Sequence, residues 1–294
     1  MAVEVIKSVK TMAQRSATLK RSGERIGLVP TMGALHEGHL SLVDIARNRS
    51  EIVVMSVFVN PTQFGEGEDL DKYPRDFDRD LRLAQERDVD ILFYPSADDV
   101  YPSNFRTEVQ VAGLSKLLCG TTRPEHFNGV TTVVAKLFNI VQPDEAYFGQ
   151  KDAQQAILIQ QMVRDLNFPI DIIVGPIVRE SDGLALSSRN VYLSDDERKQ
   201  AISLSAALIK AKKTIESGER NSKFIIREIR STLSEQPDIQ IDYVEIVDLE
   251  NLQPVEKIDG PVLVAIAAFV GTTRLIDNII IDQNESNTLK IENT

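Results

Sequence analysis

Short apolar runs alternate with segments of helical periodicity through the first part of the chain. Uninterrupted apolar runs of this length, bounded by Gly, Pro or Asn, are typical of buried strands, whereas apolar residues spaced three and four apart are typical of helices. The pattern predicts strands at 26–30, 52–60, 91–95, 145–149 and 170–178, and helices near 39–49, 71–88, 128–141 and 152–166. This alternation indicates an α/β fold, in which helices cover both faces of a parallel sheet.

The pattern changes after SDGLALSSRN at 181–190. Helical segments near 195–217 and 221–235 come before strand-like runs at 241–248, 261–271 and 276–282. This order is typical of a smaller α+β unit. We therefore predict one domain over residues 1–185 and a second over 186–294. The first 16 residues indicate an amphipathic helix, and the polar tail at 283–294 is expected to fray.

Charge and cysteine content exclude several classes of protein. With 33 Lys and Arg against 44 Asp and Glu, the formal net charge of −11 disfavours nonspecific binding to nucleic acid or to an anionic membrane. The single cysteine excludes an intramolecular disulfide and suits a reducing compartment. No signal-peptide pattern is present, and the longest apolar run, at 262–270, is too short to span a bilayer as a helix. These features predict a soluble, cytoplasmic protein.

Unusual polar clusters follow several of the predicted strands. They are TMGALHEGH at 31–39, NPTQF at 60–64, GQKD at 149–152 and RESDGLALSSRN at 179–190. In an open α/β sheet, ligands bind in the crevice beyond the carboxyl ends of the strands. We therefore expect these clusters to contribute to one site.

The HEGH cluster, at the first of these strand ends, favours a phosphate. Gly33 and Gly38 remove side chains where the backbone turns, and a helix starting close to Glu37 would aim N–H groups at an anion. His36 and His39 would then donate hydrogen bonds to phosphoryl oxygens. The alternatives are two ordinary histidines at a helix start, or a metal site, although HEGH is too short for HExxH and the chain has only one further histidine.

Two later clusters offer cations. Lys151 can act as a point charge on a phosphate beside Asp152, a candidate helix N-cap, and Arg189 follows two serine hydroxyls in a loop that could close on a triphosphate. Ordinary helix capping and a polar linker explain the same residues equally well. Neither GxxxxGK[ST] nor a complete GxGxxG is present, so a nucleotide would be held without those loops.

The remaining polar segments allow more than one interpretation. Asn60 and Gln63 can hydrogen-bond an uncharged polar substrate, although Asn-Pro also simply forms turns. Arg123 and His126 form a second small basic cluster or an ordinary surface loop. The acidic stretch 69–88 is interpreted as a solvated helix face, with carboxylates that could lie near a magnesium ion.

These polar clusters lie within five longer segments: PTMGALHEGHLSLV, VFVNPTQF, RPEHFNGVTTVV, FGQKDAQQ and VRESDGLALSSRNVYL. In this order, the five segments resemble the motifs of the pantothenate synthetase family, the pantoate:beta-alanine ligases. The resemblance implies a Rossmann-like nucleotide-binding domain of the HxGH nucleotidyltransferase superfamily, a smaller lid-like domain and a homodimer. It also implies a reaction in two steps: pantoate and ATP give pantoyl adenylate and pyrophosphate, and beta-alanine then displaces AMP. ATP with Mg²⁺ on its phosphates, rather than a metal held by the protein alone, is expected.

The family motifs also imply roles for individual residues. His39 is the implied acid/base residue, supported by His36, Lys151 and Arg189. Substrate contacts are implied for Gln63 and Gln155, with Asn60 and Arg123 as additions. The implied ATP contacts are Met32, Gly33, Ala34, Leu35, His36, Glu37, Gly38, His39, Gly149, Gln150, Lys151, Asp152, Val178, Leu186, Ser187, Ser188 and Arg189.

Two features of the resemblance leave questions of detail. GQKD stands where the family often has GEKD, and LSSR stands where MSSR is usual, which affects adenosine packing rather than the reaction. On chemical grounds, adenylation requires charge stabilisation but no proton transfer, so we hypothesise that His36 and His39 mainly stabilise that transition state.

The competing functions are a nucleotidyltransferase that stops at adenylyl transfer, and a nonenzymatic adenine-nucleotide sensor.

Overall fold

The structure is a computed structural model, and it describes residues 3–282. The chain forms two compact units. Within the described residues, the first comprises 3–149 together with Gln154–Gly175, and the second comprises Gln150–Ala153 together with 176–282.

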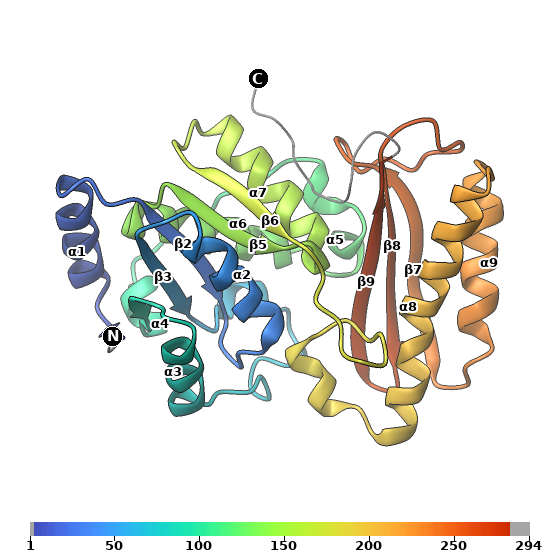
Figure 1. Ribbon diagram of the computed structural model, residues 1–294, viewed down its shortest axis with the longest axis horizontal. Helices are drawn as coiled ribbons and strands as arrows, with labels where there is room; N and C mark the ends of the chain where they lie inside the picture. Colours follow the sequence, from blue (N-terminus) through green and yellow to red (C-terminus); the bar gives the residue numbers. More distant parts are fainter. Residues whose placement is uncertain (1–2, 283–294) are drawn as a thin grey trace. The chain divides into compact units, whose positions relative to one another are not determined.

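A six-stranded sheet forms the centre of the first unit (Figure 1). Its strands are β1 (Glu4–Ile6), β2 (Ile26–Thr31), β3 (Ile52–Val57), β4 (Ile91–Phe93), β5 (Glu145–Gly149) and β6 (Asp171–Gly175). They lie in the order β1-β4-β3-β2-β5-β6, and every neighbouring pair is parallel. The predicted parallel α/β sheet is therefore confirmed.

Helices cover both faces of this sheet (Figure 1). They are α1 (Val9–Arg21), α2 (Glu37–Arg47), α3 (Phe77–Glu86), α4 (Ala97–Val100), α5 (Cys119–Thr122), α6 (His126–Val141) and α7 (Ala153–Asp165). On one face, alternate residues of β3 and one residue each of β2 and β4 join Val43 and Ala46 of α2 and Ala84 of α3 in a buried cluster. Because both faces are covered, the strands contain the uninterrupted apolar runs that made them predictable.

Several predicted elements differ from the observed ones in their bounds, and three of the differences have a local explanation. Residues 4–6 form β1, paired with β4, instead of the start of a helix; only Ile6 of the three is buried, so the apolar signal is weak. Helix α3 begins at Phe77 rather than near 71, because Asp76 caps it by accepting a hydrogen bond from the Arg79 N–H. Strand β6 ends at Gly175, since Pro176 has no N–H to continue the ladder.

The order of the strands defines where a ligand can bind. From β2, the chain proceeds to β3 and β4 on one side, whereas β5 and β6 lie on the other. The order therefore reverses between β2 and β5, and such a switch point leaves a crevice beyond the carboxyl ends of the two strands. The sequence motif that follows β2 is TMGALHEGH, and β5 ends at Gly149.

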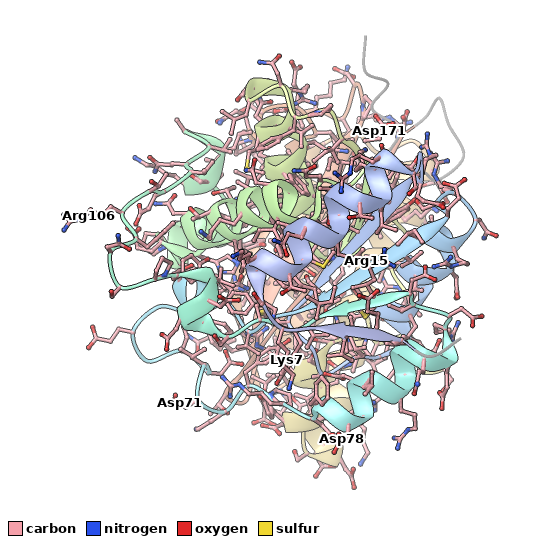
Figure 2. All side chains as sticks on the ribbon, turned by 90° about the vertical axis from the view of Figure 1, so that its left-hand side faces the viewer. Lys7, Arg15, Asp71, Asp78, Arg106 and Asp171 are labelled. Atoms are coloured by element: carbon pink, nitrogen blue, oxygen red, sulfur yellow. The ribbon has the colours of Figure 1, made fainter. Side chains whose placement is uncertain are left out.

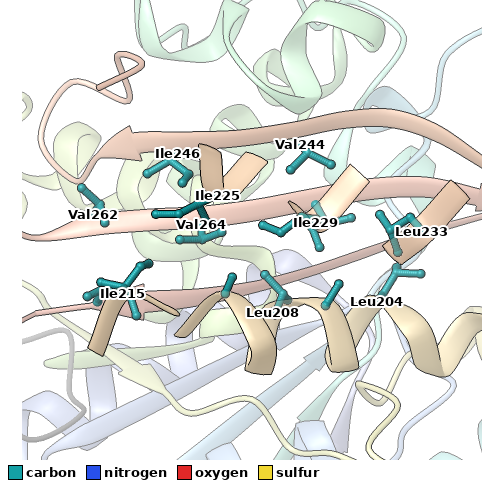
Figure 3. Close-up of a cluster of buried hydrophobic side chains, with 14 of the residues drawn as sticks. Leu204, Leu208, Ile215, Ile225, Ile229, Leu233, Val244, Ile246, Val262 and Val264 are labelled. Atoms are coloured by element: carbon teal, nitrogen blue, oxygen red, sulfur yellow. The ribbon is translucent and has the colours of Figure 1, made fainter. Parts of the chain in front are cut away.

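The second unit contains an antiparallel sheet and two long helices. The sheet has the order β7 (Ile239–Asp248), β8 (Val262–Val270) and β9 (Thr273–Ile281). Apolar residues of α8 (Asp195–Glu216) and α9 (Ser222–Ser234) pack on one face of it, as Figure 3 shows for Leu204, Leu208 and Ile229. The predicted α+β unit is confirmed.

The longest apolar run of the sequence forms β8, as predicted. It is the central strand of its sheet, and every residue of it except Phe269 is buried. Within residues 3–282, no helix is both long enough and apolar enough to cross a membrane.

Candidate functional site

Helix α2 begins at Glu37, as the position of HEGH predicts. His36 is its N-cap, and the His36 Nδ1 accepts a hydrogen bond from the Gly38 N–H at 3.2 Å. In the neutral imidazole the proton must then lie on Nε2, which makes Nε2 a hydrogen-bond donor. The His39 ring stacks on that of His36, with centroids 4.0 Å apart. Two imidazoles thus lie together at the start of a helix, where the helix dipole favours an anion.

The turn before this helix is held by a buried carboxylate that is not among the predicted site residues. Asp80 of α3 is 1% exposed, and it accepts hydrogen bonds from the N–H groups of Ala34 at 2.9 Å and Leu35 at 2.8 Å. Burial raises the pKa of Asp80, and the two backbone hydrogen bonds offset this only in part. Arg79 adds a hydrogen bond to the Leu35 carbonyl at 2.8 Å. Helix α3 therefore fixes the backbone that leads to HEGH.

The interpretation of the acidic stretch as a solvated helix face was wrong for Asp80. Asp78 of the same helix is exposed and lies at the surface in Figure 2, but Asp80 faces inward. A signal for this was present: Phe77 lies three residues before Asp80 and Ala84 four residues after it, which places the carboxylate on the apolar side of α3. A carboxylate in that position requires hydrogen-bond donors, and the turn supplies them.

The NPTQF segment after β3 contains a short 3-10 helix, Pro61–Gln63, and Gln63 contacts the TMGAL turn. The Gln63 Nε2 lies 3.0 Å from the Met32 Sδ, and the Gln63 Oε1 accepts from the Asn60 Nδ2 at 3.1 Å. Asn60 is 1% exposed; it also donates to the Gly129 carbonyl and accepts from Tyr101. These contacts favour the turn interpretation of Asn60. They bring three of the predicted site residues, Met32, Asn60 and Gln63, together.

Two residues at or just before the start of helix α6 also bind the NPTQF segment. The His126 Nδ1 lies 2.8 Å from the Gln63 carbonyl oxygen, and Arg123 donates to that oxygen at 3.3 Å. Arg123 also binds Glu68 through two nitrogens, at 2.7 and 2.5 Å. Burial raises the pKa of Glu68, but the hydrogen bonds from Arg123 outweigh it and lower the pKa. Here Arg123 pairs with a carboxylate, and its predicted substrate contact stays a prediction.

Gln154 and Gln155, in the first turn of α7, have different surroundings. Gln154 is 6% exposed, and it binds the Cys119 N–H and the carbonyls of Leu114 and Leu117. Gln155, the predicted pantoate contact, is half-buried. The loop around Cys119 is therefore bound by Gln154, the glutamine that the family motif does not assign to substrate.

The remaining predicted ATP contacts lie in the second unit, apart from Gly149 at the end of β5. The segment Gln150–Asp152 is a short 3-10 helix, and the Lys151 Nζ lies 3.8 Å from the Asp152 carboxylate. The Leu186 N–H donates to the Val178 carbonyl at 3.0 Å, which joins two of these residues. Ser187 caps the following 3-10 helix, Ser188–Tyr192, by accepting from the Arg189 N–H at 3.3 Å.

In this way each unit assembles part of the predicted set. The first unit holds Met32–His39 and Gln63 beside the switch point between β2 and β5, and the second holds Lys151 and the segment 186–189. Among the described residues 3–282, no group of three or more His, Cys, Asp or Glu side chains could hold a metal ion. The fold and the HxGH motif at the start of α2 define a nucleotide-binding α/β protein.

Comparisons with known proteins identify the family. The family described as Pantoate-beta-alanine ligase matches residues 4–280. The pantothenate synthetase of Thermosipho africanus is 55% identical over 279 residues, which cover 95% of this chain and 100% of that protein. That of Moorella thermoacetica is 53% identical over 283 residues, with coverages of 96% and 100%. The chain belongs to the pantoate-beta-alanine ligase family.

Solved structures agree with this assignment. The pantothenate synthetase of Thermus thermophilus superposes with a TM-score of 0.90 at 46% identity, covering 94% of this chain and 99% of that one. The pantoate-beta-alanine ligase of Francisella tularensis, complexed with beta-gamma ATP and beta-alanine, has a TM-score of 0.76 at 33% identity, with coverages of 95% and 98%.

Proposed function

We propose that this protein condenses pantoate with beta-alanine to pantothenate, using ATP and releasing AMP and pyrophosphate. The family match over residues 4–280 is the observation that carries this proposal. The geometry supports it, because His36 caps helix α2 and His39 lies in the first turn of that helix, beside the switch point of a parallel sheet. The pantoate carboxylate must be activated by ATP, because an amine cannot displace a carboxylate oxygen until that oxygen becomes a good leaving group.

The reaction is proposed to run in two steps. In the first, a carboxylate oxygen of pantoate bonds to the α-phosphorus of ATP, and the bond from that phosphorus to pyrophosphate breaks. In the second, the beta-alanine nitrogen bonds to the acyl carbon, AMP leaves with the electron pair of the acyl–oxygen bond, and the nitrogen loses a proton.

The residue roles are proposals of the same kind. His36 and His39 donate hydrogen bonds to phosphate oxygens, and the hydrogen bond from Gly38 favours the His36 tautomer that carries its proton on Nε2. Lys151 and Arg189 add positive charge on the phosphates. Gln63 and Gln155 hold pantoate, with Gln63 also next to beta-alanine.

The Ala34 and Leu35 amides donate to Asp80, so we propose that this turn positions α2 and contacts ATP through its other atoms. Mg²⁺ on the ATP phosphates would neutralise charge as pyrophosphate leaves, and such an ion needs only one or two protein oxygens. We further propose that the protein is a homodimer, which sedimentation velocity tests, and that it is located in the cytoplasm. We also propose that residues 1–185 form an ATP- and pantoate-binding part and residues 186–294 a lid-like part.

One assay distinguishes this function from its competitors. Purified protein is incubated with ATP and Mg²⁺, and AMP release is measured with pantoate, with beta-alanine, with both and with neither. The ligase requires both for full turnover. Full-rate release with pantoate alone would refute the ligase, and product that retains AMP would identify an adenylyl transferase. No turnover despite ATP binding would indicate a sensor.

A second assay tests the role of His39. We expect His39→Ala to lower both pantoate-dependent ATP–pyrophosphate exchange and amide formation, because the imidazole stabilises the adenylation transition state. Removal of one such donor lowers kcat by about 100- to 1,000-fold. If exchange stays intact while amide formation is lost, His39 acts instead as the base of the second step.

A further inference from the structure

Strand β9 carries two adjacent buried polar residues, Asp277 and Asn278, which are 3% and 4% exposed. Since successive residues of a strand point to opposite faces of a sheet, the two side chains leave β9 in opposite directions. A buried polar side chain needs hydrogen-bond partners, and each of these residues finds them in a segment that is distant in the sequence.

Asn278 holds the segment that contains Lys151. Its Nδ2 donates to the carbonyl oxygens of Gln150 at 3.1 Å and Lys151 at 3.0 Å, and its Oδ1 lies 3.3 Å from the Gln150 Nε2. The two carbonyls belong to the peptide planes on either side of the Lys151 Cα. Fixing both planes fixes the backbone dihedral angles of Lys151, and therefore the direction in which its side chain leaves the chain.

Asp277 holds the segment that leads to Arg189. Its carboxylate accepts two hydrogen bonds from the Arg179 guanidinium, at 2.6 and 2.9 Å, and it also accepts one from the Asn278 N–H at 2.8 Å. The Arg179 Nη1 donates in turn to the Gly183 carbonyl at 3.2 Å. A bidentate pair of this kind fixes orientation as well as distance.

We propose that the Asp277–Asn278 pair of β9 is a positioning site for ATP binding, which holds Lys151 and the segment 179–189 in the arrangement that binds the phosphates. The pair touches no substrate itself and acts through those two segments. The inference rests on the proposed function, because it takes Lys151 and Arg189 as phosphate contacts. It assigns to the strand at the edge of the second unit's sheet a role in the reaction as well as in the fold.

The discriminating variant is Asn278→Asp, which keeps the size of the side chain. Its carboxylate has no N–H to donate and would face two carbonyl oxygens, so the QKD backbone must shift. A misplacement of about 1 Å can lower a rate roughly 100-fold, so we expect a fall in kcat/KM for ATP of about 10- to 100-fold. The affinity for ATP measured by calorimetry should fall together with it.

A double-mutant cycle distinguishes positioning from simple stabilisation. If Asn278 acts through Lys151, then Asn278→Asp in a Lys151→Ala background should lower kcat/KM for ATP by no more than about twofold further, since interacting sites are not additive. An equal loss in both backgrounds would overturn the proposal. So would a folded Asn278→Asp variant with the ATP affinity and kcat/KM of the unmodified protein.

Arg274→Gln is the matched control on the same strand. It breaks the pair of the Arg274 Nη2 with Asp242 at 2.7 Å, which is also largely buried and whose carboxylate belongs to β7 rather than to the QKD segment. We expect a lower melting temperature with unchanged KM for ATP. Asn278→Ser replaces the aspartate variant if that variant does not fold. If the unmodified protein binds ATP but lacks ligase activity, the proposed function fails, and calorimetry on the same variants still decides the positioning role.

Discussion

Replacement of Gly129 by alanine tests how closely helix α6 must approach the NPTQF segment. Gly129 lies in the first turns of α6, and its carbonyl accepts a hydrogen bond from Asn60. A Cβ at this position would lie 2.3 Å from the Thr62 carbonyl oxygen and 2.6 Å from the Gln63 nitrogen. Both neighbours are backbone atoms, so no side-chain rotation can relieve the overlap.

The size of the effect follows from these distances. Ordinary van der Waals contact begins at 3.4 Å, so the helix and the segment must separate by about 1 Å. Gln63 moves with its backbone, and a displacement of this size can lower the rate roughly 100-fold. Alanine favours a helix over glycine by about 1 kcal/mol, whereas overpacking costs about 1–3 kcal/mol, so the free energy of unfolding should fall by about 0–2 kcal/mol.

Steady-state kinetics and thermal unfolding measure the two effects separately. Initial rates with pantoate varied at saturating ATP and beta-alanine should show the roughly 100-fold loss in kcat/KM, while the melting temperature falls by only a few degrees. Gly260→Ala is the control, because nothing lies within 4 Å of its Cβ position. A folded Gly129→Ala enzyme within about twofold of the unmodified kcat/KM would refute the reasoning.

Two further predictions concern the carboxylates that hold the site. Burial raises the pKa of Asp80, so its contribution to stability is present at low pH and is lost as the pH rises through its folded-state pKa. Asn cannot titrate, so the stability of Asp80→Asn relative to the unmodified protein should increase as the pH rises above about 4, as measured by urea unfolding; a stability difference that does not change with pH would contradict this. Burial raises the pKa of Glu68, but the effect of Arg123 is larger, so the pKa of Glu68 is lowered overall. The contribution of Glu68 to stability is therefore present above its unfolded-state pKa and is lost as the pH falls through its folded-state pKa. Arg123→Gln should accordingly lower the free energy of unfolding by about 1 kcal/mol at pH 7 and by less below about pH 4, and an equal loss at both would count against the pair.

Some of the site could be predicted from local sequence because its signals are local. HEGH after an apolar strand predicted a helix start, and α2 begins at Glu37 with His36 as its cap. One of the two interpretations of NPTQF was a turn after a strand, and the segment contains the 3-10 helix Pro61–Gln63. Each of these depends on a few consecutive residues and their backbone preferences.

The residues that hold the site could not be found in this way. Asp80 stands among exposed carboxylates in the sequence, and only the packing of α3 shows that it binds the turn at 34–35. Asn278 is separated from Lys151 by more than a hundred residues, and no periodicity relates the two. A buried polar group is defined by its partners, and partners from distant segments are visible only in the folded chain.

By itself, then, the sequence determined the alternation of strands and helices, the strand ends where polar motifs gather and, through those motifs, the family. These properties depend on hydrophobic periodicity and on short motifs, which each segment carries independently of the rest. The tertiary structure decided the strand order β1-β4-β3-β2-β5-β6, and with it the switch point beside α2. It also decided which buried side chains fix the site, because hydrogen bonds between distant segments form only when the whole fold excludes water from them.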